Sequence, residues 1–207
     1  MIPPSQVVHV VDDDEAVLDA MRLLFRSVGL PCRGYGSATE FLEAFDPDQP
    51  GCLVLDVRMP GVSGLDLQRE LLRRGTVIPI IFVTAHGDVP MAVDAMKAGA
   101  ADFLQKPFRD QDLLTKVQQA LARDTEYRAE ASAHREAQAH LATLTPREHE
   151  IMERVVAGQA NKVIASELGI SQRTVEVHRA RVMEKMGVDS VADLVRKALQ
   201  AKEASPS

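Results

Sequence analysis

Five short apolar runs, each followed by a segment with the spacing of an amphipathic helix, occupy the first half of the chain. A β-then-α alternation of this kind predicts one parallel sheet with helices packed on its faces. The predicted strands are 7–11, 31–35, 52–56, 79–84 and 102–105, and the predicted helices are 14–27, 37–44, 64–74, 91–98 and 110 onward.

Two of these runs, CLVLD and IPIIFVTA, are almost wholly apolar, as expected of central strands that helices cover on both faces. Ser37 and Glu40 have the spacing of a capping box, which supports a helix start at that point. The predicted fold class of residues 1–123 is therefore α/β, a doubly wound, five-stranded parallel sheet of the flavodoxin-like type.

Residues 124–143 are rich in Ala, Glu, Arg, Gln and His. Between Pro107 and Pro146 no Gly or Pro interrupts a helix. A flexible tether is the alternative, but Ala and Glu are good helix formers and Gly and Ser are scarce here. We therefore expect a helical linker.

After Leu144 the pattern is helical throughout. Thr145 can cap a helix whose first position is Pro146 and whose Glu148 reaches back to the cap. The segment 144–207 is therefore predicted to be an all-α domain. Its predicted helices are separated by Gly158, Gly169 and Gly187.

Composition narrows the class of protein. With 45% apolar and 26% charged residues, the chain can fold around a core and is not wholly disordered. Most of the net charge of −6 lies in residues 1–123, and the last third is weakly positive, which alone does not identify a nucleic-acid partner. Cys32 and Cys52 lie in predicted strands and are expected to be reduced thiols, not a disulfide or zinc site.

No apolar run approaches the roughly 20 residues that a membrane helix needs. The start MIPPSQVVHVVDDD lacks the basic-then-apolar layout of a secretion signal. We therefore expect a cytoplasmic protein that has no membrane partner.

Ionisable or hydroxyl side chains stand at the ends of four predicted strands: Asp12 and Asp13, Asp56, Thr84 and Lys106. In an open parallel sheet, ligands bind beyond these carboxyl ends. Clustered carboxylates repel one another unless a cation neutralises them, and carboxylate oxygens suit Mg²⁺. Beside Mg²⁺ and a lysine, an aspartate can attack phosphorus, and Asp56 is the predicted nucleophile.

The segments VVDDD, LVLDVRMPGVSG and FVTAHGDVPMAVDAMKAGAADFLQKPF together resemble the receiver domain of two-component response regulators, most closely the FixJ family. The resemblance spans essentially residues 5–123. It implies that Asp56 accepts a phosphoryl group. It also implies a Mg²⁺ site made of Asp13, Asp56 and the backbone carbonyl of Arg58, with Asp12 as a supporting acid.

The same resemblance implies how phosphorylation is sensed. Thr84 stands where the family has its phosphoryl sensor, and Lys106 where it has its phosphoryl-binding cation. Phe103 occupies the place of an aromatic side chain that rotates when the sensor hydroxyl moves. In that family the bond that corresponds to Lys106-Pro107 is usually cis.

The segment NKVIASELGISQRTVEVHRARVMEKMG has the pattern of a helix-turn-helix, with a turn at Gly169 and a second helix capped by Ser171. It resembles the four-helix DNA-binding domain of the LuxR/FixJ type. In the second helix Val175, His178, Val182 and Met186 recur at core spacing. The residues expected to face outward are Arg173, Glu176, Val177, Ala180 and Glu184.

The outward face suggests contacts in a major groove. Glu176 could accept from a cytosine amine, Val177 and Ala180 could contact a thymine methyl, and Arg173 could reach a guanine edge or a phosphate. A further set of residues is predicted to contact the DNA backbone, and the alternative for each of them is a solvated surface position. The predicted contacts to the DNA backbone are Lys162, Thr174, Arg179, Arg181 and Lys185.

These features predict a transcription regulator and not an enzyme. A sensor histidine kinase would phosphorylate Asp56, the chain would form a homodimer and bind a double-stranded DNA operator, and RNA polymerase would be a further partner. A Mg²⁺-dependent phosphatase with an aspartyl intermediate is one alternative. An interaction module that ignores DNA is the other.

Overall fold

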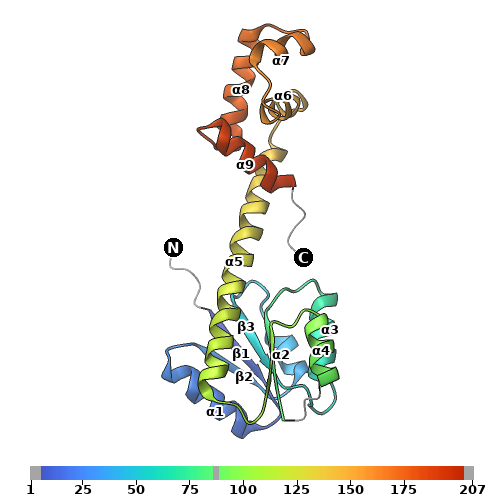
Figure 1. The fold of residues 1–207 in the computed structure, drawn as a ribbon, viewed down its shortest axis with the longest axis vertical. Coiled ribbons are helices and arrows are strands. Elements are labelled where there is room, and N and C mark those ends of the chain that lie inside the picture. The colour runs from blue at the N-terminus through green and yellow to red at the C-terminus, as the bar shows by residue number, and fades with distance from the viewer. Residues whose placement is uncertain (1–5, 86–88, 203–207) are drawn as a thin grey trace. The chain divides into compact units, whose positions relative to one another are not determined.

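A computed structural model describes residues 6–85 and 89–202. The chain divides into two compact units, residues 1–126 and residues 127–207, and each has its own core (Figure 1). Within the described residues, no helix combines the length and the apolar character needed to cross a bilayer.

The first unit contains a five-stranded parallel sheet with strand order β2-β1-β3-β4-β5. The predicted α/β fold class is therefore confirmed. Its strands are β1 (Val7–Val11), β2 (Cys32–Tyr35), β3 (Gly51–Leu55), β4 (Ile80–Thr84) and β5 (Asp102–Gln105). Its helices are α1 (Glu15–Ser27), α2 (Ala38–Ala44), α3 (Gly64–Arg73), α4 (Val89–Lys97) and the first part of α5 (Asp110–Ala142).

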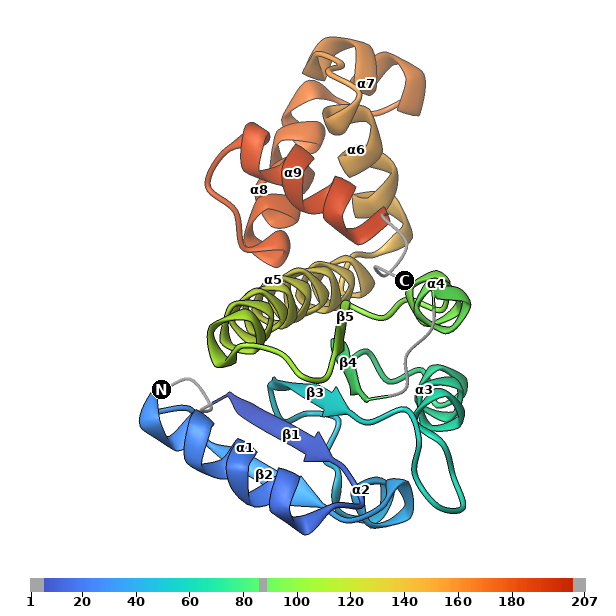
Figure 2. The ribbon, with the colours of Figure 1, turned by 60° about the horizontal axis from the view of Figure 1, so that its bottom comes forward.

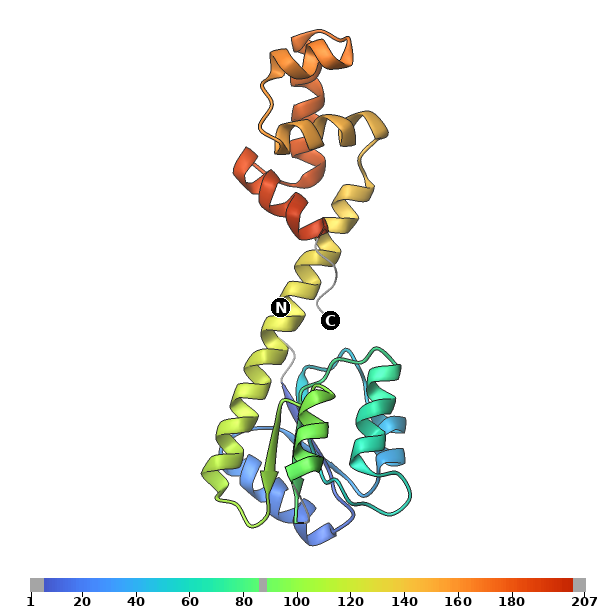
Figure 3. The same ribbon diagram turned by 45° about the vertical axis from the view of Figure 1, so that its right-hand side comes forward.

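Helices cover both faces of this sheet (Figure 2 and Figure 3). On one face, Phe41 of α2 and Leu67 of α3 belong to the same core cluster as Ala95 of α4. On the other face, Phe25 of α1 and Leu113 of α5 share a second cluster. Every residue of β1, β3 and β4 is buried, which accounts for the almost wholly apolar sequences of these strands; His9 and Thr84 are the polar exceptions.

Side-chain caps fix where the helices of the first unit begin. Asp14 caps α1 by accepting from the backbone N–H of Ala16. Ser37 caps α2 by accepting from the N–H of Glu40, but the Glu40 carboxylate accepts from the N–H of Gly36. The predicted capping box is thus present in its first half, and its second half is displaced by one residue.

The second unit is helical, and it contains the predicted helix-turn-helix as α7 and α8. Its core gathers side chains from all of its helices, among them Ile151, Ile164, Val175 and Leu194. Thr145 and Glu148 form the predicted capping box. The helices that follow α5 are α6 (Pro146–Val156), α7 (Asn161–Leu168), α8 (Gln172–Met186) and α9 (Val191–Lys202).

The predicted linker, 124–143, lies in α5 up to Ala142. The last turns of this helix belong to the second unit. His134 donates from Nδ1 to the backbone carbonyl of Gln200 in α9 at 2.7 Å, and Ala137 is fully buried. The last part of α5 is therefore packed structure, and the domain limits 1–123, 124–143 and 144–207 stay a prediction.

Candidate functional site

The carboxyl ends of three strands bring Asp12, Asp56 and Lys106 together. Asp12 follows β1, Asp56 follows β3 and Lys106 follows β5. The Lys106 ammonium lies 2.7 Å from Asp12 Oδ2 and 3.5 Å from Asp56 Oδ1. One positive charge thus faces two carboxylates, so the pocket has an excess of negative charge.

Asp56 is buried, with 8% of its surface exposed, and Asp12 is buried to a similar degree. Its Oδ2 accepts from the backbone N–H of Arg58 at 2.6 Å. Burial raises the pKa of Asp56, while the Arg58 amide and the Lys106 ammonium lower it and Asp12 raises it further. Oδ1 has the longer contact, 3.5 Å to Lys106, and is the less engaged of the two oxygens.

Gly64, the first residue of α3, lies directly against the backbone of Asp56. A Cβ atom at this position would lie 2.2 Å from the backbone carbonyl oxygen of Asp56. The N–H of Gly64 donates to the carbonyl of Val57 at 3.0 Å. The close approach of α3 therefore requires glycine and fixes the turn that holds Asp56.

The donor chemistry of the pocket fits Mg²⁺. Asp12 and Asp56 present hard carboxylate oxygens, and Mg²⁺ in proteins is commonly held by one or two carboxylates and completed by water. Asp13 is exposed, and across 6–85 and 89–202 no three His, Cys, Asp or Glu side chains gather as a metal cluster. The fit therefore rests on the pair Asp12 and Asp56.

Thr84 and Phe103 lie on the neighbouring strands β4 and β5. Thr84 is the last residue of β4, it is 1% exposed, and its carbonyl accepts from the backbone N–H of Lys106 at 2.9 Å. Phe103 is half-buried, and its ring centroid lies 6.4 Å from that of Phe82. The Lys106-Pro107 bond is cis. The sheet thus links the predicted sensor directly to the strand that carries Lys106.

Asp124 is a buried acid that the sequence pattern did not reveal. It is 1% exposed, and its Oδ2 accepts from the N–H of Gly51, the first residue of β3, at 2.9 Å. A Cβ atom at position 51 would lie 2.1 Å from the carbonyl oxygen of Val7. A glycine directly before the predicted strand 52–56 was the one available signal of this close approach.

In α8 the predicted core spacing is largely confirmed. Val175, Val182 and Met186 are buried, and His178 is half-buried. The Nδ1 atom of His178 is buried without a hydrogen-bond partner among the described residues. The side chains expected to face outward are all exposed: Arg173, Glu176, Val177, Ala180 and Glu184.

The basic residues of the helix-turn-helix divide into two groups. Lys162, Arg173 and Arg181 are exposed. Arg179, in contrast, donates to Asn161 Oδ1 at 2.6 Å. Lys185 donates to the buried Glu148 carboxylate at 2.6 Å and to the backbone carbonyl of Thr143 at 3.1 Å. Of the residues predicted to contact the DNA backbone, these last two have partners inside the fold.

Thr174, the remaining predicted backbone contact, lies in the first turn of α8. Its N–H donates to Ser171 Oγ at 3.0 Å, and the two hydroxyl groups lie 2.8 Å apart. Thr174 is therefore already part of the cap that starts the helix.

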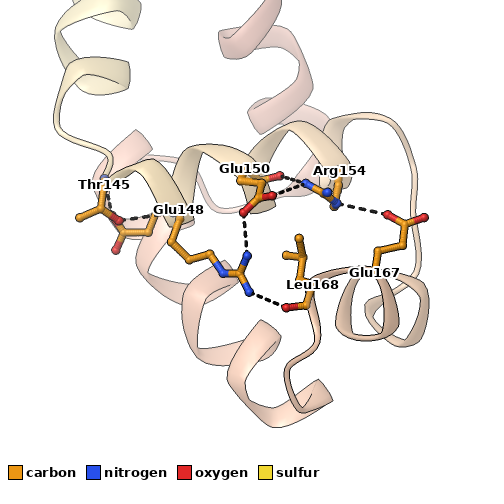
Figure 4. A network of polar contacts seen from close by, with 7 residues as sticks. Thr145, Glu148, Glu150, Arg154, Glu167 and Leu168 are labelled. Carbon is orange, nitrogen blue, oxygen red and sulfur yellow. Dashed lines mark hydrogen bonds and ion pairs between the residues drawn. The ribbon is translucent and has the colours of Figure 1, made fainter.

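A network of ion pairs joins α6 to the end of α7 (Figure 4). Arg147 pairs with Glu150 at 2.7 Å and donates to the backbone carbonyl of Leu168 at 3.0 Å. Arg154 bridges Glu150 and Glu167 at 3.4 and 3.2 Å. The carbonyl of Leu168 immediately precedes the turn, so this network helps to fix the turn between α7 and α8.

Comparison with known families gives two matches that follow the division of the fold. The response regulator receiver domain matches residues 8–118. The family described as bacterial regulatory proteins, luxR family, matches residues 142–198.

Individual relatives match over nearly the whole chain. The transcriptional regulatory protein FixJ of Azorhizobium caulinodans is 50% identical, with 97% of this chain and 95% of that protein covered. The response regulator protein TmoT of Ectopseudomonas mendocina is 48% identical, with coverages of 96% and 90%. Among solved structures, the response regulator StyR is 45% identical with a TM-score of 0.87, covering 95% of this chain and 99% of that chain.

Proposed function

Because the chain belongs to the two-component response regulators that join a receiver domain to a LuxR-type DNA-binding domain, we propose that phosphorylation of Asp56 controls its action as a transcription regulator. The observation that carries the proposal is the placement of the Asp56 carboxylate, which is buried, held through one oxygen and faced by Lys106. The proposed phosphoryl donor is the phosphohistidine of a sensor kinase.

The proposed transfer uses the less engaged oxygen of Asp56. Oδ1 forms a bond to phosphorus as the bond from phosphorus to the histidine nitrogen breaks, and the imidazole keeps the electron pair. The Arg58 N–H holds Oδ2, so the carboxylate stays oriented during the attack. The Lys106 ammonium neutralises charge on the phosphoryl oxygens.

The proposal assigns Mg²⁺ to Asp13, Asp56 and the backbone carbonyl of Arg58, with Asp12 as a supporting acid. When bound, the ion offsets the negative charge of the carboxylates and of the phosphoryl group. Lys106 already lies against Asp12 and Asp56, so the protein supplies part of this compensation itself.

Sensing is assigned to Thr84 on β4, which lies beside the acceptor strand β3, and to Phe103 on β5, the next strand of the sheet. The hydroxyl of Thr84 moves toward the phosphoryl group and Phe103 rotates with it. We place the resulting homodimer contact on the α4–β5 face, where Val93 and Met96 are 42% and 45% exposed. Exposed apolar side chains on α4 support a surface that another copy can cover.

Two copies would present two α8 helices to the two half-sites of an operator. Glu176, Val177 and Ala180 are proposed to read base edges, and Arg173 reads a guanine or a phosphate. Lys162, Thr174 and Arg181 are proposed to contact the backbone. RNA polymerase is the proposed further partner, because the relatives are transcriptional regulators.

The test combines the solution molecular mass with the affinity for a mixed pool of DNA duplexes. Both are measured with and without Mg²⁺ and a small phosphodonor, for the unsubstituted protein, Asp56→Asn and Glu43→Gln. The last variant removes an exposed carboxylate of α2 and serves as the control for the loss of one negative charge.

A gain in mass and in DNA affinity that requires the donor, persists in Glu43→Gln and is lost in Asp56→Asn supports the proposal. Equal values in all states would contradict control by Asp56. Turnover of the added phosphodonor with no change in DNA binding would favour a phosphatase instead.

A further inference from the structure

Arg179 differs from the other arginines on its helix in what it touches. Arg173 and Arg181, which lie six residues before it and two residues after it in α8, are exposed. Arg179 is half-buried, and its guanidinium donates to the side-chain oxygen of Asn161 at 2.6 Å. The sequence pattern grouped Arg179 with phosphate contacts, whereas its hydrogen bond is to Asn161, inside the fold.

The partner of Arg179 lies where α7 begins. Asn161 is the first residue of α7, and the preceding residue, Ala160, offers no side-chain cap. The hydrogen bond therefore joins the middle of α8 to the first turn of α7, the two helices of the helix-turn-helix.

The other contacts between these helices are mainly apolar. Ile164 of α7 and Val175 of α8 belong to the same buried cluster. Apolar contact is non-directional, so it holds the helices together without fixing how far one can slide on the other. A short hydrogen bond from a planar guanidinium is directional, so it can fix the position of α8 relative to α7.

We propose that Arg179 is a positioning residue that sets the angle and register of α8 on α7 through Asn161. The backbone contacts then come from Lys162, Thr174 and Arg181, and from Arg173 where it meets a phosphate. This inference rests on the proposed function, because it assumes that α8 reads DNA.

The two roles predict different behaviour in salt. A residue that neutralises a phosphate reduces the slope of log affinity against log salt by about 1 when it is removed, and it weakens binding to all sequences alike. A residue that positions α8 leaves the slope unchanged. Its loss weakens binding to a matched sequence more than to a scrambled one, because base contacts depend on the setting of the helix.

The experiment uses the full chain and two probes: a duplex enriched from a random pool by the unsubstituted protein, and a scrambled duplex of the same composition. Affinities are measured over a range of salt concentrations for Arg179→Ala, Asn161→Ala and the double variant. Arg181→Ala is the matched control on the same helix. Asn161→Asp keeps the acceptor oxygen and serves as the conservative variant.

For Arg179→Ala and Asn161→Ala we expect similar losses of about tenfold on the enriched duplex, a smaller loss on the scrambled duplex and an unchanged salt slope. The double variant should lose no more than either single variant, because both remove one interaction. Asn161→Asp should keep the ratio of the affinity for the enriched duplex to that for the scrambled duplex. Arg181→Ala should weaken both duplexes alike and reduce the slope.

A reduced salt slope in Arg179→Ala, or additive effects of the two single substitutions, would overturn the positioning role. An unchanged affinity ratio in Asn161→Ala would do the same, and this variant decides the matter if Arg179→Ala does not fold. If the unsubstituted protein enriches no duplex, the proposed reading of DNA fails, which is a distinct result.

Discussion

The carboxylate of Asp124 is buried at the amino end of β3, the middle strand of the sheet, where it accepts the N–H of Gly51. Asp124→Ala would leave that N–H without this acceptor. We expect a loss of roughly 2 kcal/mol in the free energy of unfolding of the first unit. Chemical denaturation of the full chain measures it.

Glu126→Ala, an exposed acid two residues later in α5, is the control and should change stability by less than about 0.5 kcal/mol. Equal effects of the two substitutions would mean that the bond to Gly51 contributes nothing.

His9 lies in β1 among aromatic rings. It is 1% exposed, its Nδ1 lies 3.0 Å from the Tyr35 hydroxyl, and its ring packs edge-on against Phe41 and Phe45. Burial lowers the pKa of His9 to about 4, and the charge of Arg33 contributes. The imidazole is therefore neutral at pH 7.

Because the pKa of His9 is lower in the folded chain than in the unfolded one, acid favours unfolding. The stability linked to this group is fully present above about pH 6.5 and is lost as the pH falls toward 4. We expect His9→Phe to flatten the decline of the urea midpoint of the first unit across this window. Parallel declines in the two proteins would show that His9 does not titrate in this way.

At the scale of residues, local spacing predicted the strand ends and the α8 core positions, but not the partners of polar side chains. Asp124 and Gly51 are far apart in the sequence, as are Lys185 and Glu148. Nothing in a local pattern says which distant group a charged side chain will meet. Such pairs depend on tertiary packing, which is why they became visible only in the structure.

Two glycines end helices in the second unit with similar backbone conformations. Gly169 has φ +63° and Gly187 has φ +62°. A Cβ atom would meet nothing within 4 Å at position 169, but at position 187 it would lie 3.0 Å from His140 Cε1. A side chain would therefore strain the backbone at both positions, and at position 187 it would also contact His140 closely.

Gly169→Ala should cost about 1 kcal/mol through backbone strain alone. Gly187→Ala should cost more, because the His140 ring must also shift. Thermal unfolding of both variants measures the difference in stability loss. Adding His140→Ala to Gly187→Ala should restore the extra stability that Gly187→Ala loses relative to Gly169→Ala. A larger loss in Gly169→Ala would contradict this reading.

At the scale of elements, the sequence predicted the βα order and the cap of α6 because both depend on neighbouring residues. The Thr145 and Glu148 box is one example. The role of Glu148 beyond that box was not predictable: Lys185 lies beside its carboxylate and lowers its pKa to about 2. One side chain therefore joins the start of α6 to the last turns of α8.

At the scale of the molecule, α5 is a single helix that contributes to both units. Its last turns pack against α9 through His134, and Lys197 of α9 pairs with Glu136 at 3.1 Å. A fragment that begins at residue 144 lacks these contacts. A fragment that begins at residue 127 keeps them.

We expect the fragment 127–207 to melt roughly 5 °C or more above the fragment 144–207, because it retains buried contacts with α9. Circular dichroism on heating measures both. His134→Ala should lower the melting temperature of the longer fragment part of the way toward that of the shorter one. Identical melting would show that the second unit is complete from residue 144.

Residues along α8 have different roles, and this limits which substitutions the helix tolerates, in evolution or in the laboratory. Val175, Val182 and Met186 pack in the core. Arg179 and Lys185 donate hydrogen bonds to neighbouring segments. Substitution there alters the scaffold before it alters the preferred DNA sequence. Under the proposed reading of DNA by α8, new operator preferences are most accessible through a small set of exposed positions, which a combinatorial library could cover: Arg173, Glu176, Val177 and Ala180.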